Sequence, residues 1–207
     1  MSEQAIEQLL ELLVIDGPPS AESTVVAVIR QMLADAGVPS DAVHEDHAQQ
    51  QSEYGGDVGN LIVRFGGTGR GPRRLFSCHM DTIPNAVGCT PQRQDDRIVN
   101  TAAGRALGGD NRAGCAVLLE VARVLLAWQR DHVPTTLAFL IQEEVGLVGA
   151  RGLDLGALGP HLPAMGYNFD GSRADRVITS VIGTERFTID LTGIEAHAGA
   201  HPENGVP

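Results

Sequence analysis

The sequence contains no lysine, so all 15 of its basic residues are arginines, and 26 acidic residues outnumber them. The resulting formal charge of −11, without a basic stripe, argues against a nucleic-acid partner and against an anionic membrane surface. The three cysteines have no CxxC spacing, so no disulfide framework is indicated. No apolar run approaches about 18 residues, and the N-terminal stretch lacks the basic start of a signal peptide. These absences predict a soluble, cytoplasmic protein.

Segments with helical and strand-like patterns alternate along the chain. Apolar residues at helical spacing predict a helix over 2–14 and a second one, with Ser20 as its N-cap, that ends at Gly37. The polar residues 41–59 predict a solvated loop. Strands are predicted over 61–65, 75–82, 97–100, 135–141, 165–169, 177–181 and 187–191, and a clear helix follows Gly114. Strands that alternate with helices indicate an α/β fold in which helices cover the sheet.

The strand over 75–82 ends in a histidine and an aspartate two positions apart. Because residues i and i+2 of a strand point to the same side, His79 and Asp81 share one side of the strand's end. A histidine that binds a metal usually donates its other N–H to a carboxylate, which fixes its tautomer. This spacing is therefore typical of a metal ligand and the partner that orients it.

Further acidic residues follow other predicted strands and loops. The full set of such residues is His79, Asp81, Asp110, Glu143, Glu144 and Asp170. Ligands gather at the carboxyl edge of α/β sheets, so these side chains are expected to converge there. Adjacent carboxylates are costly unless a cation compensates them. One imidazole with several carboxylates suits Zn²⁺, with Mn²⁺ or Co²⁺ as substitutes, and such a set could hold two ions about 3.5–4 Å apart.

Five ordered motifs carry a family resemblance: HMDT, GGDNRAG, EEVGLVGARG, NFDG and EAHAGAHPENG. Together they resemble the dizinc exopeptidase and deacylase family, which includes peptidase T, carboxypeptidase G and acetylornithine deacetylase. The sequences of the motifs are most similar to those of the peptidase T branch. The resemblance extends from about residue 5 to the last residue. The resemblance implies an α/β zinc-exopeptidase fold, a mixed sheet flanked by helices, with an inserted lid that serves dimerisation.

The resemblance also implies a metal-binding role for several residues. His79 and Asp170 would bind the first of two Zn²⁺ ions, and Glu144 would bind the second. Asp110 would bridge both ions, often after a strained or cis peptide in this family. Asp81 would orient His79.

Two further residues would take part in catalysis. Glu143 would be the general base that deprotonates the bridging water. His197 matches the lid histidine that, in dimeric members, reaches the partner's active site and polarises the scissile carbonyl. The expected domains are a catalytic, metal-binding domain over 1–184 and the start of the lid over 185–207, so a homodimer through the lid is expected.

Two positions depart from the family pattern. The chain has Asp110-Asn111-Arg112 where the family usually has Asp-Asp-Lys or a similar run, although the bridging carboxylate is kept. The family's fifth ligand, a histidine downstream of the lid, is missing, and His201 belongs to the lid motif and is a poor substitute. We therefore expect the chain to be either a fragment of a longer protein or a truncated gene product with impaired activity.

The predicted function is metal-dependent hydrolysis of peptide bonds in short peptides by a peptidase T-like aminopeptidase. Two alternatives remain open at this point. An N-acyl amino acid deacylase would share the same metal residues and differ in the substrate pocket. A truncated, non-catalytic product would bind metal and turn nothing over.

Overall fold

The computed structural model describes residues 2–127, 131–171, 173, 175–183, 187, 189–190 and 192–206. The chain divides into two compact units, Met1–Ser172 and Arg173–Pro207, and each is described by itself. Among the described residues, no helix has the length and apolar character needed to cross a membrane.

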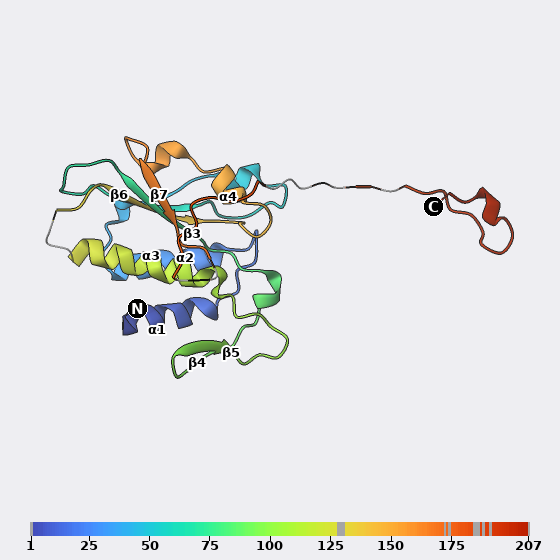
Figure 1. Ribbon diagram of the computed structural model, residues 1–207, viewed down its shortest axis with the longest axis horizontal. Helices are drawn as coiled ribbons and strands as arrows, with labels where there is room; N and C mark the ends of the chain where they lie inside the picture. The colour runs from blue at the N-terminus through green and yellow to red at the C-terminus, as the bar shows by residue number, and fades with distance from the viewer. Residues whose placement is uncertain are drawn as a thin grey trace. The chain divides into compact units, whose positions relative to one another are not determined.

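A five-stranded mixed sheet forms the centre of the first unit (Figure 1). Its strands, in spatial order, are β1 (Val43–Glu45), β2 (Leu61–Phe65), β6 (Thr135–Leu140), β3 (Arg74–His79) and β7 (Met165–Asn168). Strand β3 runs parallel to both β6 and β7, whereas β2 is antiparallel to β1 and to β6. The predicted α/β class, with a mixed sheet flanked by helices, is confirmed.

Three helices lie on one side of this sheet (Figure 1). They are α1 (Glu3–Leu13), α2 (Ser23–Asp35) and α3 (Gly109–Ala127). A short helix α4 (Val148–Arg151) follows β6, and β4 (Pro91–Gln94) pairs with β5 (Arg97–Asn100) in a separate hairpin. Single 3₁₀ turns occupy Ser40–Ala42, Ala48–Gln51, Pro84–Ala86, Leu155–Leu158 and Pro202–Asn204.

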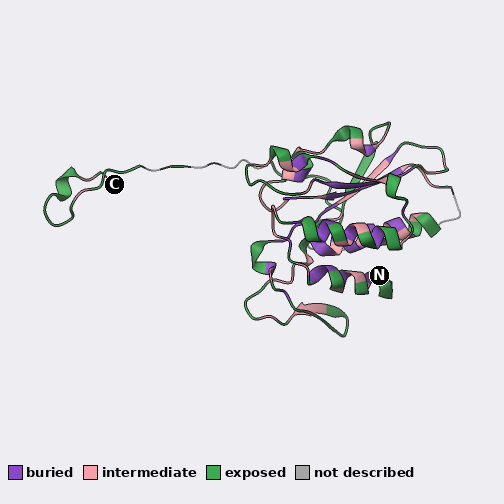
Figure 2. Cartoon of the chain, turned by 180° about the vertical axis from the view of Figure 1, so that it is seen from behind, coloured by how far each residue is buried: buried purple, intermediate pink, exposed green. Residues whose placement is uncertain are grey.

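The core lies between the sheet and the three helices, where buried residues concentrate (Figure 2). Successive residues of β2 and β6 are buried rather than alternate ones, including Leu61, Ile62, Leu137 and Phe139 at 0% exposure. A strand covered on both faces buries each of its side chains, which explains the continuous apolar runs in the sequence.

Several local predictions are wrong. Ser20 does not cap the second helix, because its φ is 72° and α2 begins at Ser23 with Glu22 at the N-cap position. The predicted loop over 41–59 is not entirely irregular. It contains β1, which pairs with β2, and two 3₁₀ turns.

The second unit contains an isolated bridge between Ile194 and Val206 and the turn Pro202–Asn204. The strand predicted over 177–181 is not formed in the described part of this unit. The strand predicted over 187–191 falls partly outside the described residues. The domain boundary at residue 184 remains a prediction.

Two leucines of α3 provide a matched test of this core. Leu118 is fully buried, whereas Leu126 is 40% exposed. Leu118→Ala is expected to lower the free energy of unfolding by about 2–5 kcal/mol, because it removes buried methyl groups and leaves a cavity. Leu126→Ala should cost less than about 1 kcal/mol. Urea denaturation curves of both variants measure the difference, and equal losses would contradict this description of the core.

Candidate metal centre

The parallel strands bring three chain segments to one edge of the sheet. In the register of β3 and β6, His79 lies opposite Leu140, and Gln142-Glu143-Glu144 follows two residues later. In the register of β3 and β7, Ser77 lies opposite Asn168, and Asp170 follows. The carboxyl ends of all three strands therefore meet where the polar side chains begin, as the sequence predicted.

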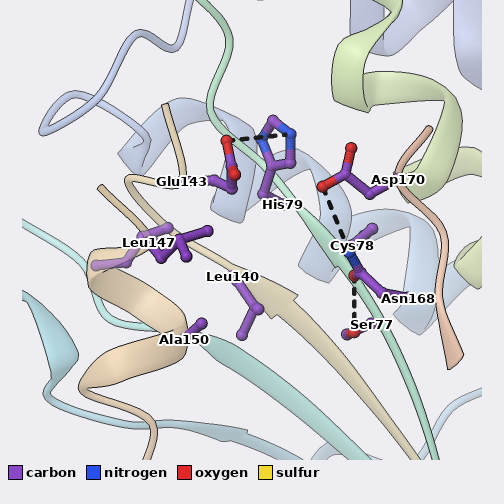
Figure 3. Close-up of a pocket in the computed structure, with 10 residues that line it drawn as sticks. Ser77, Cys78, His79, Leu140, Glu143, Leu147, Ala150, Asn168 and Asp170 are labelled. Carbon is purple, nitrogen blue, oxygen red and sulfur yellow. Dashed lines mark hydrogen bonds and ion pairs between the residues drawn. The ribbon is translucent and has the colours of Figure 1, made fainter. Parts of the chain in front are cut away.

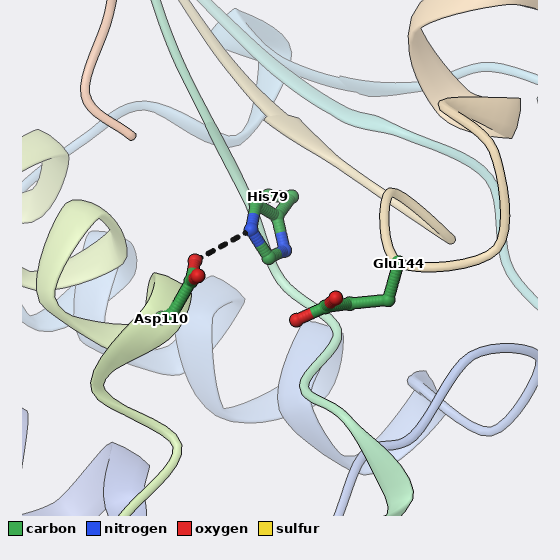
Figure 4. Close-up of side chains that lie close together, drawn as sticks. All are labelled: His79, Asp110 and Glu144. Atoms are coloured by element: carbon green, nitrogen blue, oxygen red, sulfur yellow. Dashed lines mark hydrogen bonds and ion pairs between the residues drawn. The ribbon is translucent and has the colours of Figure 1, made fainter. Parts of the chain in front are cut away.

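Three side chains at this edge form a group that could hold a metal ion (Figure 4). One ligand atom from each of His79, Asp110 and Glu144 lies within 4.8 Å of the others. Nε2 of His79 is 3.0 Å from Oδ1 of Asp110. A nitrogen and two carboxylate oxygens are ligands that Zn²⁺ accepts in proteins. The described residues at this edge therefore fit a divalent cation.

Asp81 is fully buried and connects His79 to the segment after β6. Its backbone oxygen lies 3.0 Å from Nδ1 of His79, and its carboxylate Oδ1 lies 3.4 Å from the same nitrogen. The carboxylate also accepts hydrogen bonds from the amides of Glu143, at 2.9 Å, and Glu144, at 3.1 Å. Asp81 thereby holds the imidazole so that Nε2 faces Asp110. Its role in orienting a metal ligand remains a prediction.

Glu143 and Asp170 line the same pocket as His79 (Figure 3). A carboxylate oxygen of Glu143 lies 3.9 Å from Nε2 of His79, and the Glu143 side chain is 29% exposed. Asp170 accepts a hydrogen bond from the side chain of Asn168, which is hydrogen-bonded to Ser77. Asp170 lies outside the group formed by His79, Asp110 and Glu144, and its role as a ligand remains a prediction.

The charges at this edge change the acidity of its members. Burial alone would lower the pKa of His79, but the hydrogen bond and charge of Asp81 and the charges of Asp170 and Glu143 raise it to about 9. Burial raises the pKa of Glu143, and nearby carboxylates add to this against the opposing effect of His79. Burial also raises the pKa of Glu144, followed by the charge of Asp110. Crowded carboxylates of this kind are stabilised by a cation.

Asn111 and Arg112, which depart from the family pattern, make hydrogen bonds that hold the chain next to Asp110. The peptide bond between Asp110 and Asn111 is cis. The Asn111 side chain donates to the backbone oxygen of Phe169 at 2.7 Å and accepts from the amide of Gly114 at 2.9 Å. Arg112 is 1% exposed and donates to the backbone oxygen of Ile15 at 3.1 Å. Both side chains therefore fix the start of α3, while the Asp110 side chain remains 74% exposed.

The last predicted residue belongs to the second unit. In that unit, Nδ1 of His197 accepts hydrogen bonds from the amides of Gly199 and Ala200. Its predicted catalytic role remains a prediction.

Sequence reasoning missed the roles of two buried residues, Glu22 and Gln142, which fix the start of the segment after β6. Glu22 accepts a hydrogen bond from the amide of Gln142, and the Gln142 side chain binds the 52–55 loop. No sequence signal identified them, because neither belongs to a motif and both contacts are long-range.

Comparisons with known proteins agree with this geometry. The model of Peptidase family M28 matches residues 60–176. The chain belongs to this family. Its resemblance to dizinc peptidases, predicted from five motifs, is confirmed.

Individual relatives extend the comparison beyond the matched segment. The uncharacterized protein YqjE of Bacillus subtilis is 30% identical over 202 residues, which cover 97% of this chain and 52% of YqjE. A tripeptidase from Staphylococcus aureus superimposes with a TM-score of 0.72 at 30% identity, over 84% of this chain and 44% of that structure. Aminopeptidase PepT from Bacillus cereus superimposes with a TM-score of 0.71 at 27% identity, over 98% of this chain and 52% of that structure. The chain spans about half the length, or less, of the curated relatives that it matches.

The raised pKa of His79 would make metal binding at this group depend on pH. Because the pKa is about 9, the metal-free imidazole is protonated at pH 7.5, and a metal can bind Nε2 only after that proton leaves. We expect zinc binding at pH 7.5 to release about one proton from His79, and the apparent affinity to rise about tenfold per pH unit towards pH 9. Calorimetry in two buffers of different ionisation enthalpy measures the release. Proton uptake, or an affinity independent of pH, would contradict this assignment.

Proposed function

We propose that the chain provides the metal-binding part of a peptidase T-like aminopeptidase, which hydrolyses peptide bonds in short peptides with a metal-activated water. The observation that carries this proposal is the position of Glu143. Its carboxylate lies 3.9 Å from the His79 imidazole, beside the group of His79, Asp110 and Glu144 but outside it. A carboxylate next to a metal site, yet not needed as a ligand there, is available to move a proton.

Two Zn²⁺ ions, with Mn²⁺ or Co²⁺ as substitutes, would polarise the scissile carbonyl when bound and lower the pKa of water towards about 7. In this proposal His79 and Asp170 would hold the first ion, Glu144 would hold the second, and Asp110 would contribute to both. Asp81 keeps the His79 imidazole in the orientation and tautomer that leave Nε2 for the metal.

Glu143 acts as the general base in this proposal. Its carboxylate takes a proton from the attacking water and returns it to the leaving amine. Burial raises the pKa of Glu143, which makes its carboxylate a better proton acceptor than an exposed one. His197, from the lid of a partner subunit in a homodimer, would polarise the scissile carbonyl. Similarity to a tripeptidase and to an aminopeptidase favours peptides as substrates.

Replacement of Glu143 tests the proposed reaction. Glu143→Gln is expected to lower the turnover of a tripeptide panel by about 10²–10⁴-fold, because the amide cannot accept the proton. Zinc stoichiometry should remain unchanged. Glu11→Gln, at an exposed position of α1, is the matched control and should retain full turnover. If Glu143→Gln leaves the measured hydrolysis unchanged, Glu143 is not the base.

The same assay separates the alternatives. The panel contains tripeptides and N-acetyl amino acids, and exclusive cleavage of the N-acetyl compounds would replace the peptidase assignment by the deacylase one. No turnover of either class by the zinc-loaded chain would favour a non-catalytic metal-binding product.

Zinc stoichiometry tests the ligand assignment without an activity assay. Elemental analysis after saturation and removal of loose metal is expected to give two equivalents per chain. Asp110→Ala should lose both, because its carboxylate is assigned to both ions. Asp96→Ala is the matched control, since Asp96 is a strongly exposed aspartate in the β4–β5 hairpin. Retention of both equivalents in Asp110→Ala would exclude the bridging role.

A further inference from the structure

Three successive amides donate to buried carboxylates immediately after β6. The amide of Gln142 donates to Oε1 of Glu22 at 3.0 Å. The next two amides, those of Glu143 and Glu144, donate to the two oxygens of Asp81. The segment that carries the proposed base and a proposed ligand is therefore held through its backbone, which leaves both glutamate side chains free to face the metal centre.

Glu22 is a buried carboxylate, and one of its two oxygens accepts the hydrogen bond from the Gln142 amide. It occupies the N-cap position of α2, but its side chain makes no capping hydrogen bond. It is 0% exposed, and its second oxygen, Oε2, has no hydrogen-bond partner among the described residues. A buried carboxylate is costly, and the amide of Gln142 offsets this cost first, followed by the backbone at Glu22 and Ser20.

The backbone at Gln142 explains why this segment needs support. Its φ of 50° lies in the left-handed region, which is uncommon for a residue other than glycine. Its side chain is also held, because it accepts from the hydroxyl of Ser52 and donates to the backbone oxygen of Gly55 at 2.8 Å. Such a conformation persists when the surrounding contacts determine it. The chain turns here, so the position of Gln142 sets the direction of Glu143 and Glu144.

The surroundings of Glu22 determine how readily it ionises. Burial, followed by the charge of Asp81, raises its pKa to about 7, although the amide of Gln142 opposes the increase. Arg112 is the buried cation within electrostatic reach of both Glu22 and Asp81. The protonated and ionised forms of Glu22 can each accept a hydrogen bond from an amide.

We propose that Glu22 is a positioning residue for the metal centre, which acts by holding the amide of Gln142 and thereby the direction of Glu143 and Glu144. This inference rests on the proposed function for the roles of those two glutamates. Glu22 is therefore expected to control metal affinity although it lies outside the group of His79, Asp110 and Glu144.

The test compares Glu22→Ala with Glu22→Gln in the full chain. Glu22→Ala removes the acceptor of the Gln142 amide, whereas Glu22→Gln keeps an acceptor oxygen. Hydrogen exchange of a peptide that spans 142–144 reports the backbone directly, and a zinc titration reports the ligands. Glu22→Ala is expected to speed exchange at least tenfold and to weaken zinc binding by about 10–100-fold. Glu22→Gln should restore both towards the wild type, and Glu11→Ala serves as the exposed control.

Each outcome decides the inference. A folded Glu22→Ala variant with wild-type exchange and wild-type zinc affinity would overturn it, as would equal losses in Glu22→Ala and Glu22→Gln. If Glu22→Ala does not fold, Glu22→Asp is measured in its place. Its shorter side chain keeps the carboxyl group but moves the acceptor oxygen away from the amide of Gln142. Faster exchange in Glu22→Asp supports the inference, and wild-type exchange overturns it. Both readouts are independent of turnover, so an inactive wild-type chain would count against the proposed function alone.

Discussion

The carboxylate of Asp81 makes the contacts on which the candidate metal centre depends. It faces Nδ1 of His79 and also accepts the amides of Glu143 and Glu144, so a single buried group sets the orientation of side chains from two strands. A buried carboxylate is stable only with such partners. The imidazole and the two glutamates are therefore positioned together, and a shift of Asp81 would move all three.

The sheet provides the frame for these contacts. Parallel pairing of β3 with both β6 and β7 places three carboxyl ends at one edge. The group that could hold a cation is completed from outside the sheet by Asp110, at the start of α3. There, Asn111 and Arg112 are anchored to the backbone of distant segments. The site thus combines a rigid strand edge with a helix start that is fixed by buried polar side chains.

Much of this arrangement could be predicted from the sequence, because its signals are local. Continuous apolar runs identified the buried strands β2 and β6, and polar residues at strand ends identified the edge where His79, Asp110 and Glu144 meet. The start of α2 and the strand β1 were mispredicted because they depend on contacts that spacing does not encode. Glu22 was missed for the same reason: its burial and its contact with Gln142 join residues that are far apart in sequence.

The pairing of β3 has a consequence for folding kinetics. Arg74 lies opposite Thr135 on one side and opposite Met165 on the other, so both neighbours of this strand come from far along the chain. Contacts of such high sequence separation require the closure of long loops and form late and slowly. The imidazole and the glutamates become neighbours only after β3 and β6 have paired. Formation of the candidate metal site during refolding would therefore report the pairing of β3 with β6.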